Sequence, residues 1–175
     1  MKFACTLAFC AVLLVTVPAV AQSPKKTESL TVGGQTLTIV YSAPSVRGRK
    51  IFGDGGLISN DPTYPIWRAG ANSATAFHTT SKLEINGLAV PAGDYTLFVN
   101  VKDPDNWELV INKQTGQWGL TYKQSEDLGR VRMTMSKPAV PVEVCTYKLT
   151  DLGGNRVKLE LAWENHSASV VLAIK

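Results

Sequence analysis

The sequence predicts a mostly β protein, an antiparallel β-sandwich or jelly roll in a single domain. Three observations lead to this prediction. Apolar and polar residues alternate with a period of two in many short segments, and Gly-, Asn- and Pro-containing turns separate these segments. Apart from a short turn near residues 123–128, no segment has the apolar spacing of an amphipathic helix. Alternation alone leaves a closed barrel as the alternative.

The first 21 residues have the layout of a secretory signal peptide. Lys2 supplies a positive charge, an apolar run covers residues 3–17, and Pro-Ala-Val-Ala at residues 18–21 offers a cleavage site before Gln22. The run is short for a membrane span, and no later run is long and apolar enough to be one. We therefore expect an exported protein, periplasmic or extracellular, with no transmembrane segment after cleavage.

The predicted organisation has three parts: the signal peptide at residues 1–21, a flexible lead-in at residues 22–29, and a β-sandwich domain at residues 30–175. Within the domain, Asn86-Gly87 is the strongest hairpin signal, because a type I′ turn needs positive φ at both central residues. Alternating strands are expected at residues 30–41 around a Gly-Gly turn, and at residues 83–85, 95–101, 107–111, 131–135, 157–163 and 169–174.

One long segment, residues 44–76, shows no alternation and is rich in Gly, Pro, Asn and Ser. Loops of this length in a compact domain are usually either functional or disordered. The segment contains Ile51, Phe52, Ile66 and Trp67, and such apolar side chains favour an ordered loop.

Charge and cysteine content exclude some classes of function. The net charge is +4 at pH 7, and it becomes +3 once Lys2 leaves with the leader. These charges are scattered, whereas nucleic-acid binders gather them on one face, so we expect no nucleic-acid partner. Cys145 is the one cysteine left after cleavage, and its strand-like surroundings predict a buried, unreactive thiol without a disulfide.

No catalytic, metal or cofactor motif is present in the sequence. The two histidines, His78 and His166, are far apart and lack partners at metal-ligand spacing, and there is no nucleophile elbow or phosphate-binding loop. We expect structural roles for both histidines, with His166 in a turn at residues 165–167, and we expect no metal and no cofactor.

A binding site is a better-supported hypothesis. Arg47, Arg49 and Arg68 lie in the long irregular segment, where guanidinium groups can hold a carboxylate or phosphate in bidentate fashion. Asn72 follows them, and Trp118, just after a turn, is a candidate exposed ring for stacking. The alternative is that these arginines pin the loop through Asp54, Asp61 or backbone carbonyls.

Several distinctive motifs follow one another along the chain. The opening motif is Tyr-Ser-Ala-Pro-Ser-Val-Arg-Gly-Arg-Lys-Ile-Phe-Gly at residues 41–53, followed by Trp-Arg-Ala-Gly-Ala-Asn-Ser-Ala-Thr at 67–75. The later motifs are Ile-Asn-Gly at 85–87, Pro-Ala-Gly-Asp-Tyr-Thr-Leu-Phe at 91–98, Asn-Lys at 112–113 and Gln-Trp-Gly at 117–119. In these motifs the chain resembles a bacterial secreted family known as "domain of unknown function 2911", and the resemblance covers roughly residues 30–175.

This resemblance implies a leader-bearing bacterial protein, and it brings no known activity, cofactor or catalytic residue. One segment departs from the family. Between Gly56 and Trp67 the family commonly runs Leu-Val-Pro-Tyr-Gly-x-Val-Trp, whereas this chain has Leu-Ile-Ser-Asn-Asp-Pro-Thr-Tyr-Pro-Ile at residues 57–66. If that loop borders a site, its specificity differs in this chain.

Three functional hypotheses follow from these observations. The first is an exported β-sandwich that binds a small polar or anionic ligand, such as a saccharide, through Arg47, Arg49, Arg68, Asn72 and Trp118. The second is a structural or protein-interaction module of the cell envelope, whose protein partner the sequence leaves unknown. The third is a carbohydrate-active hydrolase, which requires two carboxylates across a cleft, with Asp94, Glu84 and Glu108 as candidates.

Overall fold

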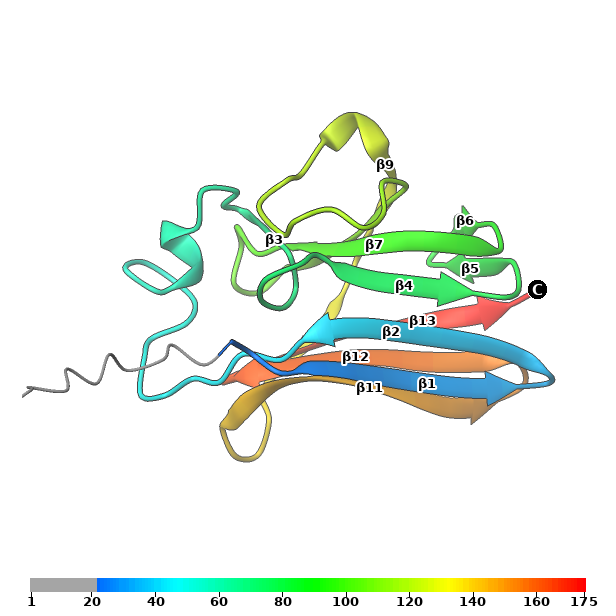
Figure 1. Cartoon of the computed structure of the whole chain (residues 1–175). Coiled ribbons are helices and arrows are strands. Elements are labelled where there is room, and N and C mark those ends of the chain that lie inside the picture. Colours follow the sequence, from blue (N-terminus) through cyan, green and yellow to red (C-terminus); the bar gives the residue numbers. More distant parts are fainter. Residues whose placement is uncertain (1–21) are drawn as a thin grey trace, which may run out of the picture.

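The computed structural model describes residues 22–175, so the predicted signal peptide lies outside the described residues. These residues form two antiparallel sheets packed face to face, which confirms the predicted sandwich (Figure 1). Within the described part of the chain, no helix is long enough and apolar enough to cross a membrane.

The first sheet has the strand order β1-β2-β4-β7-β8-β9, and β3 also pairs with β7. The second has the order β11-β12-β13-β5-β6, and β10 also pairs with β13. The strands of the first sheet are β1 (Lys25–Val32), β2 (Gln35–Ser42), β3 (Ile66–Trp67), β4 (Thr75–Thr79), β7 (Gly93–Asn100), β8 (Glu108–Asn112) and β9 (Asp127–Arg132). Those of the second are β5 (Leu83–Ile85), β6 (Leu88–Val90), β10 (Thr134–Ser136), β11 (Val142–Gly153), β12 (Arg156–Glu164) and β13 (His166–Ile174). Two short 3-10 helices are η1 (Ile58–Asn60) and η2 (Gln124–Glu126).

The core lies between the two sheets and follows the predicted alternation. In β2, Leu37, Ile39 and Tyr41 are buried while the residues between them are partly exposed. In β12, Leu159, Leu161 and Trp163 alternate in the same way. Because side chains alternate across a strand, each strand presents one apolar face to the opposite sheet.

The first strand begins earlier than predicted. β1 starts at Lys25, which pairs with Ser42, so most of the flexible lead-in predicted at residues 22–29 is strand. Two contacts explain this: Ser29 Oγ lies 3.0 Å from Thr38 Oγ1, and the Glu28 carboxylate accepts a hydrogen bond of 2.9 Å from the Leu149 N–H of β11. The latter bond also ties the two sheets together along this edge, where β1 lies beside β11 (Figure 1).

The chain passes from one sheet to the other within the segment predicted as a single strand at residues 131–135. β9 ends at Arg132 and pairs with β8, whereas β10 starts at Thr134 and pairs with β13. Between them, the Met133 N–H donates to the Trp107 carbonyl at 2.8 Å and its side chain is buried. The segment predicted as one strand is therefore two strands, one in each sheet.

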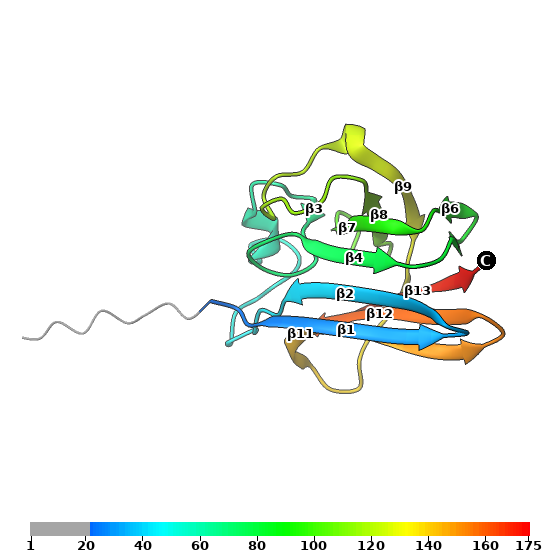
Figure 2. The same cartoon turned by 45° about the vertical axis from the view of Figure 1, so that its right-hand side comes forward.

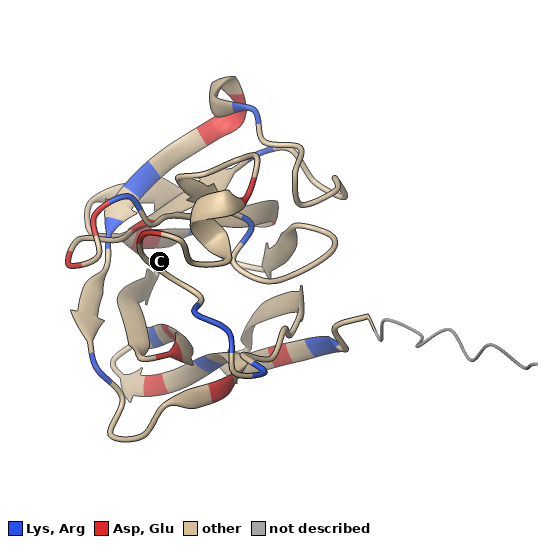
Figure 3. Cartoon of the chain, turned by 90° about the vertical axis from the view of Figure 1, so that its left-hand side faces the viewer, with Lys and Arg blue, Asp and Glu red and all other residues tan. Residues whose placement is uncertain are grey.

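The long segment at residues 44–76 is ordered, as its apolar residues predict. Ile51, Phe52, Ile66 and Trp67 are all buried. The segment lies at the end of the sandwich where β12 turns into β13, as both views of the ribbon show (Figures 1 and 2). Charged residues are distributed over many strands and loops at this end (Figure 3).

The buried position of Cys145 generates a prediction. Its side chain is fully buried in β11, and burial raises the pKa of the thiol far above its ordinary value, so the reactive thiolate does not form at neutral pH. We expect a thiol reagent to leave the native protein unmodified and to label one cysteine after denaturation in the protein without its leader. Stoichiometric labelling of the native protein would contradict this packing.

Candidate functional site

Five rings pack together at the loop end of the sandwich, and Phe52 lies at their centre. Its ring centroid is 5.5 Å from that of Trp67, 4.8 Å from Trp107, 5.8 Å from Trp163 and 4.8 Å from His166. The residues around Phe52 come from β3, β12, β13 and the segment before β8. Phe52 therefore joins the long loop to both sheets through ring contacts.

The loop reaches this position through a tight turn after Phe52. The Gly56 N–H donates to Gly53 O at 2.9 Å, and the Ile58 N–H donates to Ile51 O at 3.0 Å. Gly56 is required here because a Cβ at this position would lie 2.6 Å from the Ile51 carbonyl oxygen. The close backbone approach closes the loop and directs Phe52 inward.

Glu164 occupies an unusual position in the hairpin between β12 and β13. Trp163 pairs with His166, which leaves Glu164 and Asn165 as a two-residue turn, one residue earlier than the turn predicted at 165–167. Glu164 has φ of 55°, a left-handed conformation that is costly for a residue with a side chain. Positive φ at the first central residue is a position where hairpins favour Gly.

The contacts of the Glu164 side chain explain why this turn position holds Glu instead of Gly. One carboxylate oxygen, Oε1, accepts a hydrogen bond of 2.9 Å from the Ile51 N–H, and the other, Oε2, lies 3.4 Å from His166 Nδ1. The carboxylate therefore contacts the loop that carries Phe52 and the strand that carries His166.

His166 packs against aromatic rings and lies beside the Glu164 carboxylate. Its imidazole stacks on Trp107 with an interplanar angle of 10° and a centroid distance of 5.4 Å. Burial lowers the pKa of His166 below its ordinary value, and the nearby carboxylates of Glu164 and Asp105 only partly offset this effect. Burial therefore favours the neutral imidazole.

These groups border a cleft of about 320 Å³. Phe52, Trp107 and His166 line it together with Tyr64, whose side chain is 44% exposed, so a bound molecule can reach this ring. Polar groups at the cleft come from Asp54, Ser59 and Lys102. The volume falls at the small end of the range for small-molecule sites, roughly 300–1,000 Å³.

Of the predicted site residues, Arg47, Arg49 and Asn72 line a different, open cleft of about 250 Å³. The Arg49 guanidinium donates to the backbone carbonyls of Val46 at 3.0 Å and Ser45 at 2.7 Å, so it pins its own loop. The Arg47 side chain is exposed and has no hydrogen bond within residues 22–175, while its backbone N–H donates to Glu143.

Arg68 and Trp118 lie elsewhere at this end. The Arg68 guanidinium pairs with the Asp61 carboxylate at 2.8 Å and lines a third cleft, which is the loop-pinning role named as the alternative. Trp118 is 54% exposed, as predicted. Gly119 packs tightly on Arg68 and on the carbonyl of Asn72. Asn72 itself has a positive φ of 58°. The five residues thus lie in one region but do not line a single cleft.

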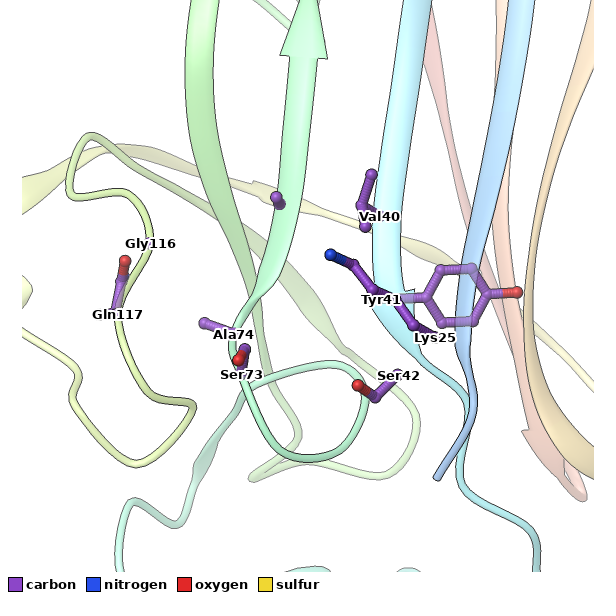
Figure 4. A pocket seen from close by; sticks show the side chains of 9 residues that line it. Lys25, Val40, Tyr41, Ser42, Ser73, Ala74, Gly116 and Gln117 are labelled. Carbon is purple, nitrogen blue, oxygen red and sulfur yellow. The ribbon is translucent and has the colours of Figure 1, made fainter. Parts of the chain in front are cut away.

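A further cleft of about 270 Å³ lies on the outer face of the first sheet (Figure 4). Ser73, which forms a β-bridge with Trp118, is part of its lining. The Lys25 ammonium points into the space between β2 and the segment that carries Gln117, whereas the Tyr41 ring points away from it (Figure 4). Its walls include the small side chains Ser42, Ser73 and Ala76, and the one aromatic residue among its lining, Tyr41, turns its ring away, so this cleft offers no ring for stacking.

The carboxylates considered for hydrolysis have other partners. Asp94 lies 2.8 Å from His78, Glu84 lies 3.1 Å from Lys175, and Glu108 accepts a hydrogen bond from Asn100. None of the three lines the aromatic cleft. Among residues 22–175, no group of three His, Cys, Asp or Glu side chains is arranged to hold a metal ion.

The fold and its end cleft define an antiparallel β-sandwich in which an ordered loop and a hairpin turn enclose an aromatic, histidine-containing cleft. The chain belongs to the family described as "Protein of unknown function (DUF2911)", whose model matches residues 23–172. No curated protein and no solved structure gives a significant match to this chain. Residues 57–66, where we expect a departure from the family pattern, line the cleft through Ile58, Ser59 and Tyr64.

The position of Glu164 generates a prediction on stability. Glu164→Ala leaves the buried Ile51 N–H without its partner, which costs about 1–3 kcal/mol, and keeps a Cβ in the left-handed region. Glu164→Gly loses the same contact but relieves the backbone strain, and we expect it to be more stable than the Ala variant by about 1 kcal/mol. Denaturant unfolding of both variants measures this difference. Equal stabilities, or a more stable Ala variant, would show that the turn carries no such strain.

Proposed function

We propose that this protein is an exported binding protein, and that it holds a small polar ligand with a flat apolar face, the chemistry of a saccharide, in the aromatic cleft. The observation that carries the proposal is the combination of ring walls with one oriented imidazole. Small-molecule sites are typically apolar clefts with a few fixed polar groups, and this cleft has that composition.

The chemistry of the walls favours a saccharide over a purely apolar ligand. The C–H face of a pyranose packs on an exposed aromatic ring, and Tyr64 offers such a ring at the cleft. Hydroxyl groups around the sugar need polar partners, which His166, Asp54 and Lys102 supply. Export rests on the signal-peptide layout of residues 1–21 and would place the cleft in the periplasm or outside the cell.

A matched pair of aromatic variants tests this proposal. Tyr64 and Trp118 are both exposed rings at the loop end, but Tyr64 lines the aromatic cleft and Trp118 does not. A screen of neutral sugars, organic acids and phosphates by thermal unfolding should reveal a stabilising ligand, since a ligand at about 100 times its dissociation constant adds about 2.7 kcal/mol. We expect Tyr64→Ala to lower the affinity for that ligand at least about tenfold, because a ring contact is lost. Trp118→Ala should leave the affinity unchanged.

The same pair of variants identifies the outcomes that contradict the proposal. Loss of the response in Trp118→Ala with full binding in Tyr64→Ala would place the ligand beside the arginine-bearing loop or the outer cleft. Absence of any stabilising sugar would refute the saccharide assignment. Circular dichroism of each variant, compared with the unaltered protein, controls for misfolding.

A further inference from the structure

The orientation of His166 determines what its cleft offers to a ligand. Nδ1 is shielded from solvent and has no hydrogen-bond partner in residues 22–175, and Glu164 Oε2 lies 3.4 Å from it. Trp107 stacks on the imidazole, and Phe52 packs against it edge-to-face. Since His166 lines the cleft and Nδ1 is turned to Glu164, Nε2 is the nitrogen available to a bound molecule.

The charges around the ring fix the place of its proton. A neutral imidazole carries one proton, and a carboxylate facing Nδ1 favours that nitrogen as the donor. Glu164 faces the ring from β12, and Asp105 acts on it from the segment between β7 and β8. Asp54 and Lys102 border the same cleft from its two loops. With the proton on Nδ1, Nε2 presents a lone pair and acts as an acceptor.

We propose that His166 is the specificity-determining acceptor of this cleft: Glu164 keeps its proton on Nδ1, Nε2 accepts a hydrogen bond from a hydroxyl of a neutral polyhydroxylated ligand, and acid releases that ligand by protonating Nε2. The ligand part of this inference rests on the proposed function. It adds the group that the ligand must donate and the direction of the pH dependence.

The sign of the pH dependence follows from the two protonation states. The ligand hydroxyl donates to neutral His166, so ligand binding stabilises the neutral form and lowers the pKa of the ring further. Below the pKa of the free protein, the imidazolium has a second N–H and no acceptor, and affinity falls about tenfold per pH unit until the pKa of the complex is reached. Burial has already lowered the pKa of His166, so this loss occurs below the ordinary histidine range.

The tautomer is measured without a ligand. The chain has two histidines, so nitrogen NMR of the purified protein gives two imidazole spin systems, and His78→Gln assigns them. We expect neutral His166 to show a protonated Nδ1 and an unprotonated Nε2, with a titration midpoint below about 6.5. In Glu164→Gln the preference for Nδ1 should decrease. A neutral His166 with its proton on Nε2, or one that stays charged at pH 7, would overturn the inference.

The pH dependence is measured with neutral probes, the methyl glycosides of glucose, galactose and mannose, at about pH 7.5 and at about one pH unit below the His166 titration midpoint that NMR gives. We expect the affinity of the unaltered protein to fall about tenfold at the lower pH. His166→Gln keeps a neutral acceptor oxygen at both pH values, so its affinity should be the same at both.

The outcomes separate the two proposals. Binding that is equal or tighter in acid overturns the role of His166 and leaves the saccharide proposal intact. No binding of any probe at either pH overturns the saccharide proposal and the ligand part of this inference together. In that case the NMR result still decides whether Glu164 sets the tautomer.

Discussion

The Glu164 carboxylate is the contact on which the end of this sandwich depends. One oxygen accepts the Ile51 N–H at 2.9 Å, and the other faces His166 Nδ1 at 3.4 Å. The long loop would otherwise meet the hairpin through apolar contacts alone, which fix distance better than orientation. One carboxylate oxygen fixes the loop backbone through a hydrogen bond, while the other lies beside the imidazole. The left-handed backbone of Glu164 is the conformational cost of placing the carboxylate there.

The ring cluster supplies most of the burial around that contact. Phe52 packs edge-on against Trp67, Trp163 and His166, and His166 lies flat on Trp107. Edge-to-face and offset contacts of this kind contribute about 0.5–1.5 kcal/mol each beyond the burial of area. The rings therefore keep the cleft walls rigid, and a rigid wall costs a ligand less ordering when it binds.

The sequence predicted the sandwich because its signals are local. Alternation placed Leu37, Ile39 and Tyr41 on one face, and Asn86-Gly87, with φ of 48° and 85°, forms the turn between β5 and β6. It misplaced His166 because Asn165 and Ser167 read as turn formers, while the turn is set by the pairing of Trp163 with His166. The partnership of Glu164 with Ile51 spans 113 positions of the chain, and no local pattern encodes a contact of that separation. The arginines were recognised as a group, but Asp61 and the carbonyls of Ser45 and Val46 hold two of them.

The two walls of the aromatic cleft differ in how freely they can evolve. His166 and Trp107 are tied to the sheets, because His166 pairs with Trp163 and the Trp107 carbonyl accepts the Met133 N–H, so strand pairing sets their backbone positions. Ser59 and Tyr64 belong to residues 57–66, where loop sequence can change at little cost to the strands. The cleft thus combines a floor whose backbone the sheets hold with a loop that lies outside them, so exchange of residues 57–66 would reshape the cleft and leave the strands in place.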